Sequence, residues 1–229
     1  KSATVVLDDA DLDVASFMGL AVCTHAGQGC AIPTRMLLPR SRYDEGIEKL
    51  VTMMSAVSVG DPQRPDVLQG PQISEKQRQR VLGYIEKGKE EGARLVLGGG
   101  VPKGEEYDNG FFVEPTLFAD VDNSMTIAQE EIFGPVLVVI PFDDDEDAIR
   151  IANDSLYGLG GGVMSGSVER SLAVADKIRT GMVSINGGAP YGADLPFGGF
   201  KYSGIGRQNG DAGFDQYLEL KSYAWPAES

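Results

Sequence analysis

The residue best suited to chemistry is a cysteine in a short glycine-rich stretch. Cys30 follows Gly27 and Gly29 within Thr24–Arg35, and apolar segments run up to this stretch and away from it. Glycine tolerates positive φ and close backbone approach, so the Cys30 thiol and amide can face one pocket. A nucleophilic thiol needs this exposure, and a nearby N–H for the charge that develops on an attacked carbonyl oxygen. The alternative is a small buried cysteine in a turn.

The elements around this loop alternate between strands and helices. Strand-like apolar runs fall at 3–7, 36–38, 95–97, 136–140, 159–163 and 182–185, with a proline-kinked run at 111–118. Helical apolar spacing falls between them, at 14–22, 43–57, 74–85, 148–152 and 167–178. This alternation predicts an α/β fold with an open, twisted, mostly parallel sheet flanked by helices.

Local signals mark several helix ends. Ser41 with Asp44 resembles a capping box, and Ser74 with Gln77 marks another helix start. The helix opened at Ser167 is expected to end at Gly181 as a left-handed cap.

Composition limits the class of protein. The chain has 229 residues, of which 42% are hydrophobic and 24% charged, typical of a globular protein with a real core. The net charge of −14 argues against nucleic acid and acidic membrane surfaces as partners. No apolar run is long enough to span a bilayer, and the start does not read as a signal peptide.

Cysteine and histidine usage adds two expectations. Cys23 and Cys30 could form at most one bridge, which favours a reducing, cytoplasmic location over a disulfide framework. The single histidine, His25, excludes a histidine-rich metal site. We therefore predict no metal ligands.

The two ends of the chain suggest how it is organised. The first residue is Lys1 rather than methionine, and a strand follows almost at once, so we expect a fragment of a longer polypeptide. We predict a domain over 1–208 and a tail over 209–229. Tyr217–Ala224 alternates like an edge strand, which would pair with another subunit or with a further domain.

Three stretches together resemble the NAD(P)-dependent aldehyde dehydrogenase superfamily. They are Gly27-Gln28-Gly29-Cys30 through Arg35, Glu130-Glu131-Ile132-Phe133-Gly134-Pro135, and Pro196-Phe197-Gly198-Gly199-Phe200-Lys201 with Ser203-Gly204-Ile205-Gly206-Arg207. Each motif alone is weak, but their order and spacing also match. The resemblance extends from Lys1 nearly to the end.

The resemblance implies a mechanism centred on Cys30. Its thiolate would attack an aldehyde to give a thiohemiacetal, hydride would pass to NAD or NADP, and water would release the acid from a thioester. The resemblance also assigns cofactor contacts to Glu131, Phe133, Gln77 and Arg80. Their alternatives are a surface carboxylate, a core aromatic and two ordinary polar residues of a helix.

The resemblance places Phe197 and Tyr191 on the walls of the aldehyde channel, although both could be ordinary packing. It also implies an assembly into dimers or tetramers in the parent enzyme. His25 stands where this family often has asparagine.

The same resemblance puts several parts outside this chain. Lys1-Ser2-Ala3 resembles the residues that directly follow the family's general-base glutamate. That base, the oxyanion asparagine and an N-terminal cofactor-binding domain would then lie upstream. We therefore expect the fragment alone to be inactive as a dehydrogenase.

Two other classes of function stay open from the residues alone. A thiol esterase or hydrolase would need a histidine base beside Cys30, and His25 is the one candidate. A non-enzymatic subunit-contact module would use the tail strand over 217–224.

Overall fold

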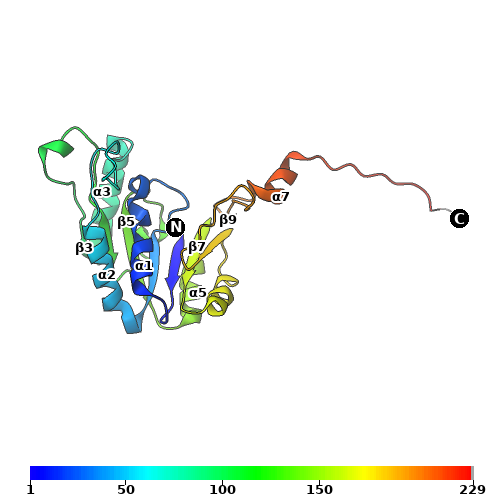
Figure 1. Ribbon diagram of the computed structural model, residues 1–229, viewed down its shortest axis with the longest axis horizontal. Coiled ribbons are helices and arrows are strands. Elements are labelled where there is room, and N and C mark those ends of the chain that lie inside the picture. Colours follow the sequence, from blue (N-terminus) through cyan, green and yellow to red (C-terminus); the bar gives the residue numbers. More distant parts are fainter. Residues whose placement is uncertain (228–229) are drawn as a thin grey trace.

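One sheet organises the protein, as Figure 1 shows for the computed structural model, which describes residues 1–227. Its seven strands run in the order β3-β4-β5-β2-β1-β7-β8. The bounds are Ala3–Val6 (β1), Arg35–Pro39 (β2), Arg94–Leu97 (β3), Thr116–Ala119 (β4), Val136–Phe142 (β5), Gly160–Met164 (β7) and Met182–Ile185 (β8). All neighbours pair in parallel except β3 with β4. The predicted α/β fold with a mostly parallel sheet is confirmed.

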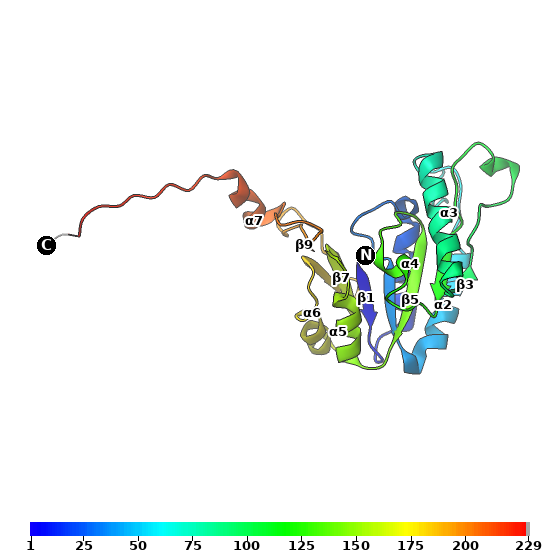
Figure 2. The same ribbon diagram turned by 180° about the vertical axis from the view of Figure 1, so that it is seen from behind.

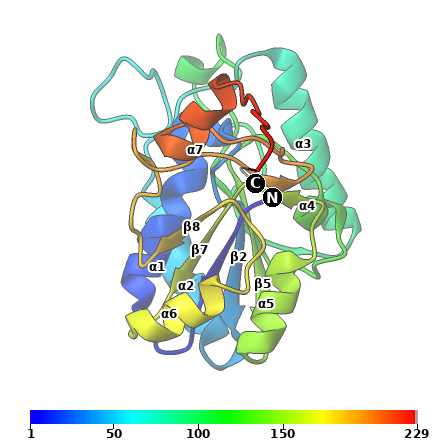
Figure 3. The same ribbon diagram turned by 90° about the vertical axis from the view of Figure 1, so that its right-hand side faces the viewer.

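Helices cover both faces of the sheet. The face seen in Figure 1 carries α1 (Leu12–Gly19) and α2 (Tyr43–Ser55). The opposite face, seen in Figure 2, carries α3 (Glu75–Glu90), α4 (Thr126–Gln129), α5 (Asp145–Asn153) and α6 (Val168–Ala175). Figure 3 shows the sheet between α1 and α2 on one side and α3, α4 and α5 on the other.

The residues of β5 explain the double cover. Val136, Val138 and Ile140 pack into the core under α3 to α6, whereas Leu137 and Val139 pack into the core under α1 and α2. Side chains alternate between the two faces of a strand, so a strand covered on both faces needs a continuous apolar run. This is why the run at 136–140 predicted a buried strand correctly.

Two of the expected helix starts are confirmed. Ser74 accepts a hydrogen bond from the Gln77 amide (3.2 Å), and Ser167 accepts one from the Arg170 amide (3.2 Å). The capping box at Ser41 is wrong: a short 3₁₀ turn, Arg40–Arg42, leads into α2, and no side chain caps that helix.

The expected left-handed cap at Gly181 is also wrong. Helix α6 ends at Ala175, and Gly181 is not among the residues with positive φ. It is required for a different reason, because a Cβ there would lie 1.8 Å from the Gly198 carbonyl oxygen. Gly181 therefore allows the 196–207 loop to approach the start of β8.

Two further expectations differ from the structure. The run at 111–118 pairs only from Thr116, because the Glu114 amide turns away to bond the Gly100 carbonyl (2.9 Å) and Pro115 has no N–H. The helix expected at 14–22 ends at Gly19 and continues from Leu20 as a 3₁₀ segment that is broken by a kink at Thr24, His25 and Ala26.

A two-stranded sheet and the tail complete the chain. Strands β6 (Tyr157–Gly158) and β9 (Phe200–Lys201) pair antiparallel and tie the 196–207 loop to the sheet. After α7 (Gly210–Phe214) and a 3₁₀ turn at Asp215–Tyr217, residues 218–227 form no strand and extend away from the body in Figure 1. The edge strand expected over 217–224 is therefore not formed within the described residues of this chain. The predicted tail boundary at 209 stays a prediction, and residues 228–229 lie outside the described residues.

Candidate functional site

The predicted site residues gather at the amino-terminal edge of the sheet. The Cys30 loop leads into β2, and the Glu131 loop leads into the neighbouring strand β5. Because β5, β2 and β1 are parallel neighbours, the segments that precede them meet at one edge. Two backbone hydrogen bonds join these entries, from the Thr34 amide to the Ser2 carbonyl (3.2 Å) and from the Val138 amide to the Thr34 carbonyl (3.0 Å).

The loop before Cys30 has an unusual backbone. His25, Ala26 and Gly27 have φ values of 50°, 53° and 73°, all in the left-handed region. A Cβ on Gly27 would lie 2.0 Å from the Gly134 carbonyl oxygen, so the close approach that the sequence predicted at this glycine is present. This conformation is strained for residues other than glycine, so it persists only where the surrounding structure holds it.

Two glutamine side chains hold this backbone, one from the loop itself and one from the distant segment around residue 72. The Gln28 side chain accepts from the Ile73 amide (2.9 Å) and donates to the His25 carbonyl (3.0 Å). Gln72, which is buried, donates to the Ala26 carbonyl (2.9 Å). No sequence pattern could indicate this role of Gln72, because a glutamine in a polar loop is ordinary and its partner lies far away in the chain.

The two cysteines have opposite environments. Cys30 is exposed, whereas Cys23 is fully buried. Burial raises the pKa of the Cys23 thiol to about 12, so this thiol stays protonated at neutral pH. A thiolate is the nucleophilic form, so only Cys30 of the pair is placed for reaction.

The two predicted channel aromatics pair with each other, and Tyr191 lies within electrostatic range of Cys30. Burial raises the pKa of the Tyr191 phenol, and the charge of the neighbouring Cys30 adds to this rise. The Tyr191 and Phe197 rings lie 6.2 Å apart between centroids. Phe197 is fixed by a reciprocal pair of backbone hydrogen bonds with Gln208, both 2.7 Å. The two rings therefore form one aromatic pair.

Helix α3 holds the loop that carries Glu131 and Phe133. The Gln77 side chain donates to the carbonyls of Ile132 (3.2 Å) and Phe133 (2.8 Å). The Arg80 guanidinium donates to the Glu131 carbonyl (2.7 Å). The structure thus brings all four predicted cofactor residues together, with Gln77 and Arg80 bonded to the loop backbone. Their contact with a cofactor stays a prediction.

Glu131 and Phe133 face outward from this loop. The Glu131 side chain is 31% exposed, and one carboxylate oxygen lies 3.3 Å from the backbone nitrogen of Lys1. Phe133 has a φ of 61°, a strained value for an aromatic residue. Its ring lines an open groove of about 1110 Å³ that His25 also lines. The Cys30 loop and the Glu131 loop therefore border a shared space.

A buried arginine anchors the strand that follows the Cys30 loop. The Arg35 guanidinium donates to the carbonyls of Lys1 (3.1 Å), Ile151 (3.0 Å) and Ala152 (2.9 Å), and to the Asn123 side chain (2.7 Å). Burial lowers the pKa of Arg35 to about 10, so it stays charged at neutral pH. Its role is to fix the start of β2 and, through it, the end of the loop.

Comparison with known proteins identifies the family to which this chain belongs. A model of the aldehyde dehydrogenase family matches residues 1–223. The chain belongs to the aldehyde dehydrogenase family.

Curated relatives include a 3-succinoylsemialdehyde-pyridine dehydrogenase of a Pseudomonas species, 46% identical over 224 residues, which covers 97% of this chain and 46% of that protein. A betaine aldehyde dehydrogenase of Brucella melitensis is 45% identical over 225 residues, with the same shares covered. The chain spans about half the length of the curated relatives it matches.

Solved structures agree with the fold. An aldehyde dehydrogenase of Mycobacterium tuberculosis in complex with NAD+ superimposes with a TM-score of 0.94 at 54% identity, covering 99% of this chain and 46% of that one. A mutant of aldehyde dehydrogenase C of Pseudomonas syringae, in complex with NAD+ and octanal, gives a TM-score of 0.94 at 42% identity, covering 100% and 47%.

Among the described helices, none combines the length and the apolar composition needed to cross a membrane.

Proposed function

We propose that this chain is the cysteine-bearing part of an NAD(P)-dependent aldehyde dehydrogenase that oxidises an aldehyde to a carboxylic acid. The observation that carries the proposal is the position of Cys30. Its thiol is exposed and lies within electrostatic range of Tyr191, and the strained loop before it borders the same groove as Phe133. Nucleophile, aromatic pair and cofactor-side loop thus occupy one edge of the sheet.

The first covalent step uses groups of this chain. The Cys30 thiolate adds to the aldehyde carbon, a C–S bond forms, and the carbonyl π pair moves to oxygen. Among the described residues, the Cys30 N–H has no hydrogen-bond partner. It is therefore free to donate to the new oxyanion, the kind of fixed donor that stabilises such charge.

The residues of the Glu131 loop fit a nicotinamide cofactor. A partly exposed carboxylate has two acceptor oxygens, which suits the vicinal hydroxyls of a ribose. Phe133 would pack beside that ribose, and Gln77 and Arg80 would position the loop through its carbonyls. When bound, the cofactor supplies the hydride acceptor. Two of the solved relatives are complexes with NAD+, in line with this assignment.

We also propose that residues 1–229 do not turn over aldehyde by themselves. Hydrolysis of the Cys30 thioester needs a base to activate water, and the resemblance places that carboxylate outside this chain. Since the curated relatives are about twice as long, the complementary half would supply it, together with the rest of the cofactor site. The tail would dock on a second copy in the parent enzyme, which we expect to be a dimer or tetramer.

The hydrolase alternative gains no support from His25. Its ring makes no hydrogen bond to Cys30 among the described residues, and its backbone is held in the left-handed region. A histidine base must lie within hydrogen-bond reach of the thiol that it activates.

Thiol labelling tests the proposal. The chain is treated with iodoacetamide between pH 6 and 9, and the labelled cysteine is identified by mass spectrometry. We expect Cys30 to react faster than Cys23 by roughly a hundredfold or more, because the buried Cys23 stays protonated. Cys30→Ser should abolish labelling, and Cys23→Ser should leave it unchanged. Equal, slow labelling of both thiols would contradict the proposal.

Turnover tests the second part. The 229-residue chain alone should give no aldehyde-dependent NADH or NADPH, whereas addition of the complementary half of a parent enzyme should restore it in the wild type and not in Cys30→Ser. Robust turnover by the chain alone would refute the claim that it is inactive by itself.

A further inference from the structure

Gln69 and Gln72 are two buried glutamines in the loop that leads into α3. The Gln69 side chain donates to the Val113 carbonyl (2.6 Å), and the Gln72 side chain donates to the Ala26 carbonyl (2.9 Å). Among residues 1–227, each side chain makes this hydrogen bond and no other. Burying an amide is costly unless it is hydrogen-bonded, so each side chain is committed to one distant carbonyl. Of the two, Gln72 is the one that reaches the Cys30 loop.

The position of Gln72 is fixed by its own backbone. Its amide donates to the Phe111 carbonyl (2.8 Å), and the amide of the next residue, Ile73, donates to the Gln28 side chain (2.9 Å). The chain is thus anchored on both sides of the Gln72 side chain. The side chain therefore approaches Ala26 from a rigid base.

The Ala26 carbonyl lies in the strained part of the loop. Ala26 has a φ of 53° and a ψ of 37°, a left-handed conformation that is unfavourable for a residue with a Cβ. His25 shares this conformation, and its carbonyl is bound by the Gln28 side chain (3.0 Å). A peptide whose carbonyl is bound cannot rotate without breaking that bond. Gln72 therefore holds the peptide that joins Ala26 to Gly27.

The direction of the Cys30 N–H depends on the path of this loop. Gly29 and Cys30 share a trans peptide, whose carbonyl oxygen accepts from the Ile32 amide (3.2 Å). The C=O and N–H of a trans peptide point in opposite directions. The bond from Ile32 therefore turns the Cys30 N–H away from this turn, where no described residue accepts from it.

The segment around Gln72 binds the chain at Ala26 and Gln28, directly before this peptide. We propose that Gln72 is a positioning residue for the Cys30 N–H, because it fixes the left-handed backbone that presents this N–H to the oxygen of an attacked carbonyl group. The inference rests on the proposed role of Cys30. Gln72 itself touches no reacting atom, so it should matter for reactions in which an oxyanion forms and not for others.

Two reagents separate this role from a general effect on the thiol. With iodoacetamide, the Cys30 sulfur bonds to a saturated carbon while the C–I bond breaks and iodide leaves, so no oxyanion forms. With p-nitrophenyl acetate, the sulfur adds to the carbonyl carbon and the π pair moves to oxygen. When that pair returns, the C–O bond to the leaving group breaks, nitrophenolate leaves, and an acetyl group stays on Cys30. A fixed N–H donor speeds the second reaction alone.

Gln72→Met keeps the length of the side chain and removes its donor. We expect it to slow acylation of Cys30 roughly tenfold, less than the hundredfold or more that loss of a whole oxyanion donor costs, because the N–H is still present but misdirected. Alkylation, which forms no oxyanion, should change by less than about twofold. Nitrophenolate absorbance and mass spectrometry measure the two rates, with Cys30→Ser as the background.

Gln69→Met is the matched control, because it makes the same change at a buried position of the same loop and leaves the Ala26 carbonyl bound. It should keep the wild-type ratio of acylation to alkylation. Ala26→Gly tests the route: glycine adopts the left-handed conformation without strain, so this change should restore part of the acylation that Gln72→Met loses. Gln72→Asn, whose amide is one methylene too short for the bond, should show the same selective loss and replaces Gln72→Met if that variant does not fold.

The outcomes separate this inference from the proposed function. The inference is wrong if the Gln72 variants keep the wild-type ratio, if Gln69→Met lowers it as much, or if Ala26→Gly restores nothing. Faster alkylation of Cys30 than of Cys23 would then still support the nucleophile. If Cys30 of the wild type reacts no faster than Cys23 with iodoacetamide, the proposed function itself fails.

Discussion

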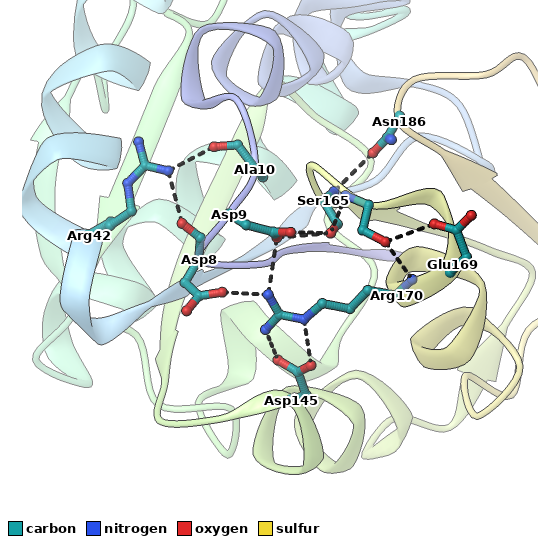
Figure 4. Close-up of polar contacts among 10 residues, drawn as sticks. Asp8, Asp9, Ala10, Arg42, Asp145, Ser165, Glu169, Arg170 and Asn186 are labelled. Atoms are coloured by element: carbon teal, nitrogen blue, oxygen red, sulfur yellow. Dashed lines mark hydrogen bonds and ion pairs between the residues drawn. The ribbon is translucent and has the colours of Figure 1, made fainter.

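Polar side chains lie at both edges of the parallel sheet. At the carboxyl edge they pair with one another, whereas at the amino edge the reactive group is left without a partner in the part of the chain that the structure describes. At the carboxyl edge, drawn in Figure 4, Arg170 lies 2.6 Å from Asp8 and 3.1 Å from Asp9, and bonds Asp145 through two nitrogens at 3.0 and 2.7 Å. Ser165 donates to Asp9 (2.8 Å). Hydrogen bonds to Asp145 and Asp8 raise the pKa of the Arg170 guanidinium above its usual value.

At the amino edge, the nucleophile candidate Cys30 has no such partners among the described residues. Cys30 is exposed, its N–H is unpaired among the described residues, and His25, Ala26 and Phe133 are held in strained conformations. The carboxyl edge is where ligands usually bind in open α/β sheets. In this protein that edge holds a cavity of about 350 Å³ in which the lining residue Arg170 is already paired with Asp8 and Asp145. The candidate site is distinguished by an exposed thiol, an unpaired backbone N–H and strained backbone conformations, and not by a high density of charged side chains.

The largest predicted effect concerns the close approach at the amino edge. Gly27→Ala would force a Cβ into the Gly134 carbonyl and add left-handed strain, so the free energy of unfolding should fall by roughly 3 kcal/mol or more. Gly92→Ala is the matched control, because Gly92 also has positive φ (90°) but no atom within 4 Å of its Cβ. It should lose about 1 kcal/mol. Urea unfolding followed by circular dichroism measures both, and equal losses would show that the Gly134 contact does not constrain the loop.

The next effect concerns the support of the Glu131 loop. Gln77→Leu leaves the Ile132 and Phe133 carbonyls without their donor, which should weaken the loop by about 1–2 kcal/mol. The amides of residues 131–134 and 136 should then exchange hydrogen roughly tenfold faster. Gln79→Leu, on an exposed position of the same helix, should leave that exchange unchanged. Unchanged exchange in Gln77→Leu would mean that other contacts hold the loop.

A smaller effect is expected at the carboxyl edge. Arg170→Met leaves three carboxylates near one another, but the Arg170 side chain is 34% exposed, so solvent screening limits the loss to about 1 kcal/mol. Arg150→Met, which removes an exposed arginine paired with Asp147, should cost less. Neither variant should alter Cys30 labelling. A changed labelling rate in Arg170→Met would show that the two edges are coupled.

The smallest effect is a pH dependence of the same edge. The hydrogen bond from Arg170 holds the pKa of Asp8 below its usual value of 3.8. The stability that Asp8 contributes is therefore present above about pH 4 and is lost as the pH falls through its folded pKa. Between pH 5 and 3, the wild type should lose more stability than Arg170→Met, by less than about 1 kcal/mol because Asp8 is largely exposed. Parallel acid unfolding curves for the two proteins would contradict this.

The sequence predicted the parts of the fold that short-range patterns determine. The apolar run at 136–140 and the Ser74 cap need only neighbouring residues to act, and both are present. The antiparallel direction of β3 was not predicted, because the apolar run at 95–97 carries no information on its pairing partner. Gly181 shows the same limit, since a glycine signals freedom but not whether φ or a close approach requires it.

The site follows the same division. Cys30 was indicated by its own loop, and Glu131, Phe133, Tyr191 and Phe197 by resemblance. The contacts that hold these residues could not be predicted, because they join distant segments. Gln72 bonds a carbonyl 46 positions away, and Gln77 bonds one 56 positions away. Only the folded sheet brings such pairs together.

The extended tail also decides which spectroscopic signal this protein offers. Trp225 is the only tryptophan in the sequence and is 80% exposed, at the far end of the segment that leaves the body in Figure 1. The indole is exposed to solvent both in the folded protein and after the sheet unfolds, so its fluorescence does not report the loss of the fold. A blue shift of the emission, with weaker quenching by iodide as the protein concentration rises, would instead report that the tail has been covered.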